Sequence, residues 1–73
     1  MLEVRINDET LFAKCIESKE KAERHLTRIQ EKHNSDTFTI KPFGVRNIKQ
    51  GIDDSVLWEK DDKCFSIWKK VKD

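Results

Sequence analysis

One segment of the chain has the spacing of an α-helix, and segments that alternate like strands lie on both sides of it. Residues 19–33 contain no glycine or proline, and apolar side chains recur there every three or four positions. Ser18 before the segment is a favourable N-cap, and Asn34 after it tolerates the left-handed conformation that ends many helices. We predict one helix over residues 19–33, with an apolar stripe made of Ala22, Leu26, Ile29 and His33.

The chain begins with two segments in which apolar and polar residues alternate. Residues 2–6 alternate, and residues 11–16 alternate again after the polar stretch at residues 7–9. Two short strands joined by turn-forming residues predict an N-terminal β-hairpin. Its second strand carries apolar side chains on both faces.

A third strand and an irregular segment follow the helix. Residues 37–41 alternate and are followed by Pro42, which predicts a strand that ends there. Residues 43–54 contain apolar residues at helical spacing, but Gly44 and Gly51 interrupt them. We expect a loop or a single helical turn in this segment.

The C-terminal part predicts a second hairpin, with its turn at residues 60–63. This turn sets a register in which all the apolar residues share one face, and a slip of one residue would destroy that pattern. The predicted facing pairs are Trp58 with Phe65, Val56 with Ile67, and Ile52 with Val71.

This order of elements resembles that of β-grasp folds such as ubiquitin-like domains, in element order and hairpin lengths rather than in any motif. The resemblance implies a small α+β fold of the ββαβ(β)β type, a sheet with a single helix packed on one face. A chain of 73 residues has room for one domain, residues 1–73, with a small core.

The two cysteines, Cys15 and Cys64, belong to no paired motif. The N-terminal residues lack the apolar run of a signal peptide, and no apolar run in the sequence is long enough to cross a membrane. Small secreted domains usually carry several disulfides. We therefore expect a cytoplasmic protein with two reduced, buried thiols. A Cys15–Cys64 disulfide is the alternative if the strands that carry them lie side by side.

The residues that usually carry catalysis or bind metals are not arranged for either. His25 and His33 are eight positions apart on the predicted helix, too far to reach one ion. The carboxylate pairs at residues 53–54 and 61–62 fall in loops or turns, where both members are solvated. Two glycines cannot make a glycine-rich phosphate loop. We expect no enzyme, no catalytic residue, no metal and no cofactor.

The charges nearly cancel, with a net charge of +1, but they are unevenly spread. The predicted helix pairs acids with bases at i,i+4 spacing, as in Glu17 with Lys21 and Glu20 with Arg24. Residues 38–52 and 63–72 instead contain cations and no acid. A basic face with an aromatic platform would bind single-stranded nucleic acid. The candidate residues for that alternative are Lys41, Arg46, Lys49, Trp68, Lys69, Lys70 and Lys72.

The chain is also rich in aromatic residues for so small a core. The narrow helix stripe leaves four apolar residues without obvious cover, namely Phe12, Ile16, Leu57 and Trp68. Exposed aromatic residues beside cations are typical of protein interfaces. We therefore expect a protein-binding module of adaptor or inhibitor type, a format also common among accessory proteins of phages and mobile elements. Its predicted contact residues are Phe12, Leu57, Trp68, Arg46, Lys69 and Lys70.

Two alternatives accompany this interpretation. Residues 43–54 would bury the same apolar side chains if they fold over the second face of the sheet. A homodimer would form if Trp68 and an edge strand pair with a second copy of the chain.

Overall fold

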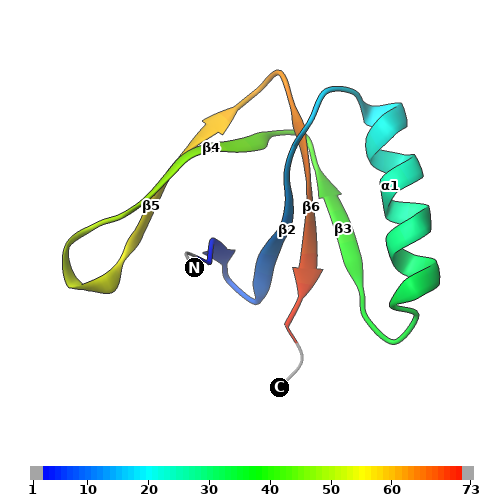
Figure 1. The fold of residues 1–73 in the computed structure, drawn as a ribbon, viewed down its shortest axis with the longest axis horizontal. Helices are drawn as coiled ribbons and strands as arrows, with labels where there is room; N and C mark the ends of the chain where they lie inside the picture. Colours follow the sequence, from blue (N-terminus) through cyan, green and yellow to red (C-terminus); the bar gives the residue numbers. More distant parts are fainter. Residues whose placement is uncertain (1–2, 72–73) are drawn as a thin grey trace.

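The computed structural model describes residues 3–71, and Figure 1 shows their arrangement. The elements, in chain order, are β1 (Arg5–Ile6), β2 (Glu9–Ile16), α1 (Lys19–Lys32), β3 (Phe38–Lys41), β4 (Gly44–Gln50), the 3-10 helix η1 (Ile52–Asp54), β5 (Val56–Asp61) and β6 (Phe65–Lys70). Leu2, at which the first strand was predicted to begin, lies outside the described residues.

The strands form two antiparallel sheets. The larger sheet has four strands in the order β1-β2-β6-β3, and β4 pairs with β5 in a separate two-stranded sheet. Strand β6 therefore has a partner on each side. Its position in the middle of the sheet explains why Ser66, Ile67 and Trp68 are completely buried.

The predicted fold class is confirmed, because the chain is an α+β protein with a single helix packed on one face of a sheet. The helix and the third strand form within one residue of their predicted bounds, and the N-terminal hairpin forms with a shorter first strand, Arg5–Ile6, and a second strand that begins at Glu9. Ser18 is the N-cap of α1, and its hydroxyl accepts a hydrogen bond of 3.2 Å from the backbone N–H of Lys21. Among residues 3–71, no helix has the length and apolar character that crossing a membrane requires.

One half of the core lies between α1 and the four-stranded sheet. It is built around four buried residues, Ile16, Ala22, Phe38 and Ile67. Leu26 and Ile29 of the helix are half-buried and pack against this cluster. The predicted apolar stripe is thus the side of α1 that faces the sheet.

The other half of the core lies under the β4–β5 hairpin. Val4, Val45 and Trp68 are buried there, and half-buried apolar residues such as Phe43 and Trp58 surround them. In Figure 1 the hairpin and α1 lie on opposite sides of the four-stranded sheet. Both faces of the sheet are therefore covered, one by a helix and the other by a hairpin.

Two predictions for the C-terminal half are wrong. In the segment 43–54, residues 44–50 form strand β4 rather than a loop, and the expected single helical turn forms only at Ile52–Asp54. The predicted hairpin between residues 56–59 and 65–68 does not form, because β5 pairs with β4, and Trp68 lies opposite Leu11 and Thr39 instead. Strand β6 has no free edge for β5, since β2 and β3 occupy both of its edges.

The expectation of two reduced thiols is also wrong. Cys15 and Cys64 form a disulfide, which was the alternative drawn from the sequence. Strands β2 and β6 are neighbours, and Ile16 lies opposite Phe65 in their ladder. The residues beside this pair are Cys15 and Cys64, so the ladder itself brings the two cysteines together.

Candidate functional site

Trp68 is not the exposed anchor that the sequence suggested. Its side chain is 0% exposed, and its indole N–H donates a hydrogen bond of 2.6 Å to the hydroxyl of Ser66. That hydroxyl donates in turn to the carbonyl of Phe43, also at 2.6 Å. Because the β4–β5 hairpin covers it, Trp68 is inaccessible to a protein partner, to a nucleic-acid base or to a second copy of the chain.

Several of the predicted basic residues are neutralised by carboxylates. Ion pairs join Lys41 to Glu9 at 3.2 Å, Lys69 to Asp36 at 3.7 Å, and Arg46 to Asp61. Lys41 also lies over the buried indole, with its ammonium 5.8 Å from the centroid of the Trp68 ring. Each of these cations already faces a carboxylate and therefore offers less charge to a phosphate backbone.

The Glu9 carboxylate is part of the same network. The hydroxyl of Thr39 donates to it, and this hydrogen bond, together with the neighbouring ammonium of Lys41, holds the pKa of Glu9 below its ordinary value of 4.5. Burial acts in the opposite direction and is the weaker influence. Glu9 therefore stays ionised and bridges β2 to β3 across the end of β6.

The remaining predicted cations do not meet in one place. Lys49 lies on β4 and Lys70 at the end of β6, in different sheets. Both are exposed. Lys72 lies outside the described residues. The predicted basic face is thus divided between two layers of the molecule.

Phe12 and Leu57 are exposed, as the sequence indicated, but they do not share a surface. Phe12 is 47% exposed and lies on the helix side, where its ring makes edge contacts with Phe38 and His33 at centroid distances of 5.2 and 6.2 Å. Leu57 is 48% exposed and lies on β5 between two residues, Val56 and Trp58, that pack into the hairpin-side core. Strand alternation therefore points Leu57 away from that core.

The helix carries a set of basic residues that the sequence reasoning missed. With 3.6 residues per turn, five basic side chains fall within about 100° of arc on α1. These residues, which we call the basic stripe, are Lys21, Arg24, His25, Arg28 and Lys32. Their i, i+3, i+4, i+7 and i+11 spacing is present in the sequence, where it is interleaved with the acids of the i,i+4 pairs.

Part of the basic stripe carries uncompensated charge. Lys21 pairs with Glu17 at 3.4 Å and Arg24 with Glu20 at 3.2 Å, and all four side chains are well exposed, so these pairs are weak. Arg28 and Lys32 have no carboxylate partner within residues 3–71. The two cations of the basic stripe that have no carboxylate partner thus both lie in the C-terminal half of α1.

The surface between this half of α1 and strand β2 is concave. A hollow of about 340 Å³ is lined by Phe12, His25, Arg28, Ile29, Lys32 and His33. A second hollow of about 370 Å³ is lined by Lys21, Arg24, His25 and Arg28. Because they share His25 and Arg28, the two form one continuous surface, which we call the aromatic–basic groove.

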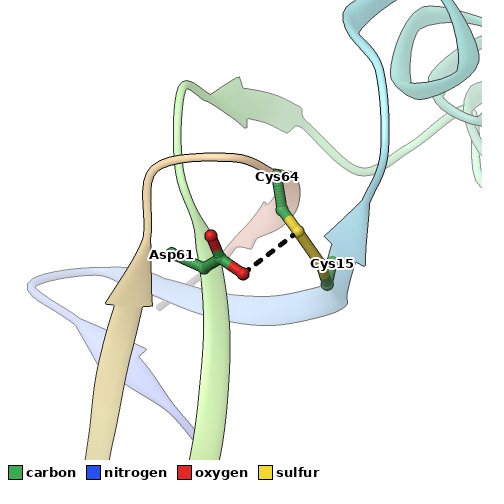
Figure 2. A group of neighbouring side chains, drawn as sticks. All are labelled: Cys15, Asp61 and Cys64. Carbon is green, nitrogen blue, oxygen red and sulfur yellow. Dashed lines mark hydrogen bonds between the residues drawn. A yellow bond between two sulfur atoms is a disulfide. The ribbon is translucent and has the colours of Figure 1, made fainter.

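A second cluster lies at the disulfide, where the four-stranded sheet meets the β4–β5 hairpin. Figure 2 shows Asp61 directed at Cys64, and its Oδ2 atom lies 3.5 Å from the Cys64 Sγ atom. The guanidinium of Arg46 pairs with Asp61 and also donates to Cys64 Sγ at 3.8 Å. Gly44 passes so close that a Cβ atom there would lie 2.5 Å from that of Cys64.

Comparison of the chain with protein-family models, with curated proteins and with solved structures finds no match in any of the three.

Proposed function

We propose that this protein is a binding module without catalytic activity and that its partner is an acidic segment of another protein, bound in the aromatic–basic groove. The observation that carries the proposal is the position of Phe12, half-exposed in a hollow beside the unpaired cations Arg28 and Lys32. Aromatic and arginine side chains are the residue types most enriched at the energetic centres of protein interfaces.

The ring of Phe12 is also held in place before any partner arrives. Its edge contacts with Phe38 and His33 restrict its rotation, so binding costs less side-chain entropy than it would for a free surface aromatic. The neighbouring cations complement a segment that carries Asp or Glu around one apolar side chain. The groove thus offers an apolar contact through Phe12 and favours acidic segments through its cations.

Nucleic acid was the alternative partner, and the groove suits it less well. The indole proposed for base stacking is buried. The basic stripe is flanked along α1 by Glu20 and Glu31, which would repel a phosphate backbone that continues beyond the groove. A short acidic peptide can end before it meets these carboxylates.

We also propose a cytoplasmic location. Two cysteines in 73 residues is fewer than small secreted domains of this size usually carry. In the cytoplasm the Cys15–Cys64 disulfide is exposed to thiol reductants, so the protein would exist in a reduced as well as an oxidised form.

Binding can be tested with labelled peptides of defined composition. The probe is a set of short Asp/Glu-rich peptides that each carry one Leu or Phe, and the readout is fluorescence anisotropy with chemical-shift mapping of the bound protein. We expect binding that weakens with salt, maps to α1 and β2, and falls at least about tenfold in Phe12→Ala and in the double variant Arg28→Glu/Lys32→Glu.

Leu57→Ala is the matched control, since Leu57 is as exposed as Phe12 but lies on the other side of the molecule. It should bind like the wild type. Failure of every acidic peptide to bind, or equal loss in Leu57→Ala, would rule the groove out. A single-stranded oligonucleotide that binds more tightly than the peptides and is lost in the same variants would replace the protein partner with nucleic acid.

A further inference from the structure

We propose that Cys15, Cys64 and Asp61 bind Zn²⁺ once the disulfide is reduced. The position that holds a covalent cross-link in the oxidised protein would then hold a metal ion in the reduced protein. This inference concerns the junction between the two sheets and is independent of the aromatic–basic groove.

The ligand atoms are already close to the geometry that zinc requires. The sulfur atoms of Cys15 and Cys64 and a carboxylate oxygen of Asp61 all lie within 4.8 Å of one another (Figure 2). Tetrahedral Zn²⁺ with Zn–S near 2.3 Å and Zn–O near 2.1 Å places sulfur and oxygen about 3.6 Å apart. The Cys64 Sγ to Asp61 Oδ2 distance is 3.5 Å.

Two small shifts are needed: the sulfur atoms have to separate, and Cys15 Sγ, which lies within 4.8 Å of the Asp61 oxygen, has to come to about 3.6 Å from it. Two thiolates on one Zn²⁺ lie about 3.8 Å apart, which follows from the same bond length. The Cα atoms of Cys15 and Cys64 are 5.3 Å apart, so rotation of the side chains provides that separation without a change of backbone. The ladder between β2 and β6 keeps these Cα positions after reduction, because its hydrogen bonds do not depend on the disulfide.

The charges and the access route also fit a cation. Two thiolates and one carboxylate carry three negative charges, which Zn²⁺ and the guanidinium of Arg46 together neutralise. The Arg46 side chain is 59% exposed, so it can shift off the Asp61 oxygen that the metal takes and still stay beside the cluster. Thiolate ligands favour Zn²⁺ over Mg²⁺ and Ca²⁺.

An ion can reach the cluster from solvent. Cys15 is exposed, and it lines a hollow of about 540 Å³ together with Val45, Arg46 and Ile48. With three protein ligands, the fourth position of the tetrahedron is left for water.

Reduction of the Cys15–Cys64 disulfide, followed by zinc binding, is chemically balanced when a cellular thiol is the reductant. The S–S bond takes up two electrons and two protons to give two thiols, while a dithiol is oxidised to its own disulfide. Zn²⁺ then replaces the two thiol protons, which are released to solvent. In the experiment below a water-soluble phosphine is the reductant; it is oxidised to the phosphine oxide, and water supplies the oxygen and the two protons.

The experiment is a metal titration of the reduced full-length protein. Co²⁺ is added first, because two coordinated thiolates give sulfur-to-cobalt charge-transfer absorption and the visible bands of tetrahedral Co²⁺. We expect one Co²⁺ per chain, its displacement by Zn²⁺, and no binding by the oxidised protein. Cys15→Ser should abolish the charge-transfer spectrum of the two-thiolate site.

The variant Asp61→Asn tests whether the metal binds to all three proposed ligands or only to two neighbouring thiols. It should weaken Zn²⁺ binding at least about tenfold, whereas Asp62→Asn, the exposed neighbour, should leave the affinity unchanged. Absence of the charge-transfer band, or equal affinity of Asp61→Asn and wild type, would overturn the proposal. If the reduced metal-free chain unfolds, Zn²⁺ must restore the native circular dichroism spectrum of the wild type, and failure to do so would overturn it equally.

Discussion

The two faces of the four-stranded sheet are covered to different extents. On the helix side α1 buries one of its own residues completely, Ala22, and leaves Phe12 of the sheet 47% exposed. On the hairpin side the β4–β5 hairpin encloses Trp68 completely, and the Cys15–Cys64 disulfide joins β2 to the turn that leads from β5 into β6. The helix thus covers its face of the sheet only in part, whereas the β4–β5 hairpin covers Trp68 completely.

The difference separates stability from recognition. A fully buried aromatic side chain contributes to the free energy of folding and has no surface to offer a partner. A half-exposed aromatic beside unpaired cations contributes less to folding and has its remaining surface free for binding. Substitutions of Trp68 on the hairpin side should therefore affect stability first, and those of Phe12 on the helix side should affect binding first.

The largest effect is expected for Trp68→Ala. Removing a buried Trp costs about 3–5 kcal/mol, an amount comparable with the whole stability of a domain this small. The variant also leaves the hydroxyl of Ser66 without the indole that donates to it. Denaturant unfolding followed by circular dichroism measures the loss.

Phe12→Ala, on the helix side of the sheet, is the substitution to compare with Trp68→Ala. With half of its ring already in water, we expect a loss of about 1–2 kcal/mol. Trp68→Phe should keep the fold and lie between the two in stability. Equal losses for Trp68→Ala and Phe12→Ala would contradict the contrast between a closed and a partial cover.

Reduction of the disulfide should have the next largest effect. Cys15 and Cys64 are separated by 49 positions, and a cross-link that closes such a loop stabilises by about 4 kcal/mol in the chain-entropy model. With a chelator present to exclude metal, we expect the unfolding midpoint to fall. Amide hydrogen exchange should rise more in β4 and β5 than in α1, because the disulfide lies at the base of the hairpin.

The double variant Cys15→Ser/Cys64→Ser should reproduce this result without reductant. Faster exchange in α1 than in β4 would show that the cross-link supports the helix side instead.

The sequence predicted the helix side well because its signals are local. Ser18, the glycine-free run and the apolar spacing all act within a few residues of one another, and all of them agree with the structure. The N-terminal hairpin is local in the same sense, since a short polar turn joins its strands.

Prediction of the hairpin side required knowing which strands pair with each other, and strands that are distant in sequence can pair. Val56 and Trp58 face the core whether β5 pairs with β4 or with β6, so their alternation could not identify the partner strand. Trp68 does point away from the helix, as predicted. The alternative that residues 43–54 fold over the second face is correct for Trp68, but the alternation could not show that residues 44–50 form a strand of that cover.

The candidate site was predicted in part for the same reason. Phe12 was recognised as uncovered, and it is exposed. The basic stripe was overlooked because acids and bases alternate along α1 in sequence, and only the helical geometry gathers the cations on one side. The cluster of Cys15, Cys64 and Asp61 requires three separate strand ends to meet, which no spacing in the sequence records.

A smaller effect is expected for Gly44→Ala, at the base of the hairpin. The added Cβ atom would lie 2.5 Å from the Cβ of Cys64 and 3.1 Å from the carbonyl of Lys14, and neither atom can rotate away. Forcing one carbon into such a site costs about 1–3 kcal/mol. Thermal unfolding measures the change.

Gly51→Ala is the matched control, since its added Cβ would meet the hydroxyl of Ser55 at 2.6 Å. Ser55 is exposed and can change rotamer, and the Leu57 side-chain atoms at 3.1 Å have room to shift because Leu57 is 48% exposed, so we expect a smaller loss of stability than for Gly44→Ala. The reverse order would show that the hairpin moves freely at its base and is not a closed cover.

The smallest effect is expected for a change of pH. It tests three polar residues on the hairpin side, Glu9, Thr39 and Lys41, which lie beside the buried Trp68. The hydrogen bond from Thr39 and the charge of Lys41 lower the pKa of Glu9 in the folded chain below its ordinary value of 4.5. The ionised carboxylate therefore stabilises the fold fully above that ordinary value, and this contribution is lost as the pH falls through the lowered pKa. The free energy of unfolding, measured from pH 7 downward, should decline over that window.

Glu9→Gln removes the ionisation and should flatten this decline, while Thr39→Val removes only the first cause of the shift and should flatten it in part. Both variants keep Phe12, Arg28 and Lys32, so peptide binding in the groove should not change. A pH profile that is the same in Glu9→Gln and wild type would mean that other carboxylates carry the acid sensitivity. In that case the Glu9–Lys41 pair would be a surface contact of little energetic consequence rather than part of the cover over Trp68.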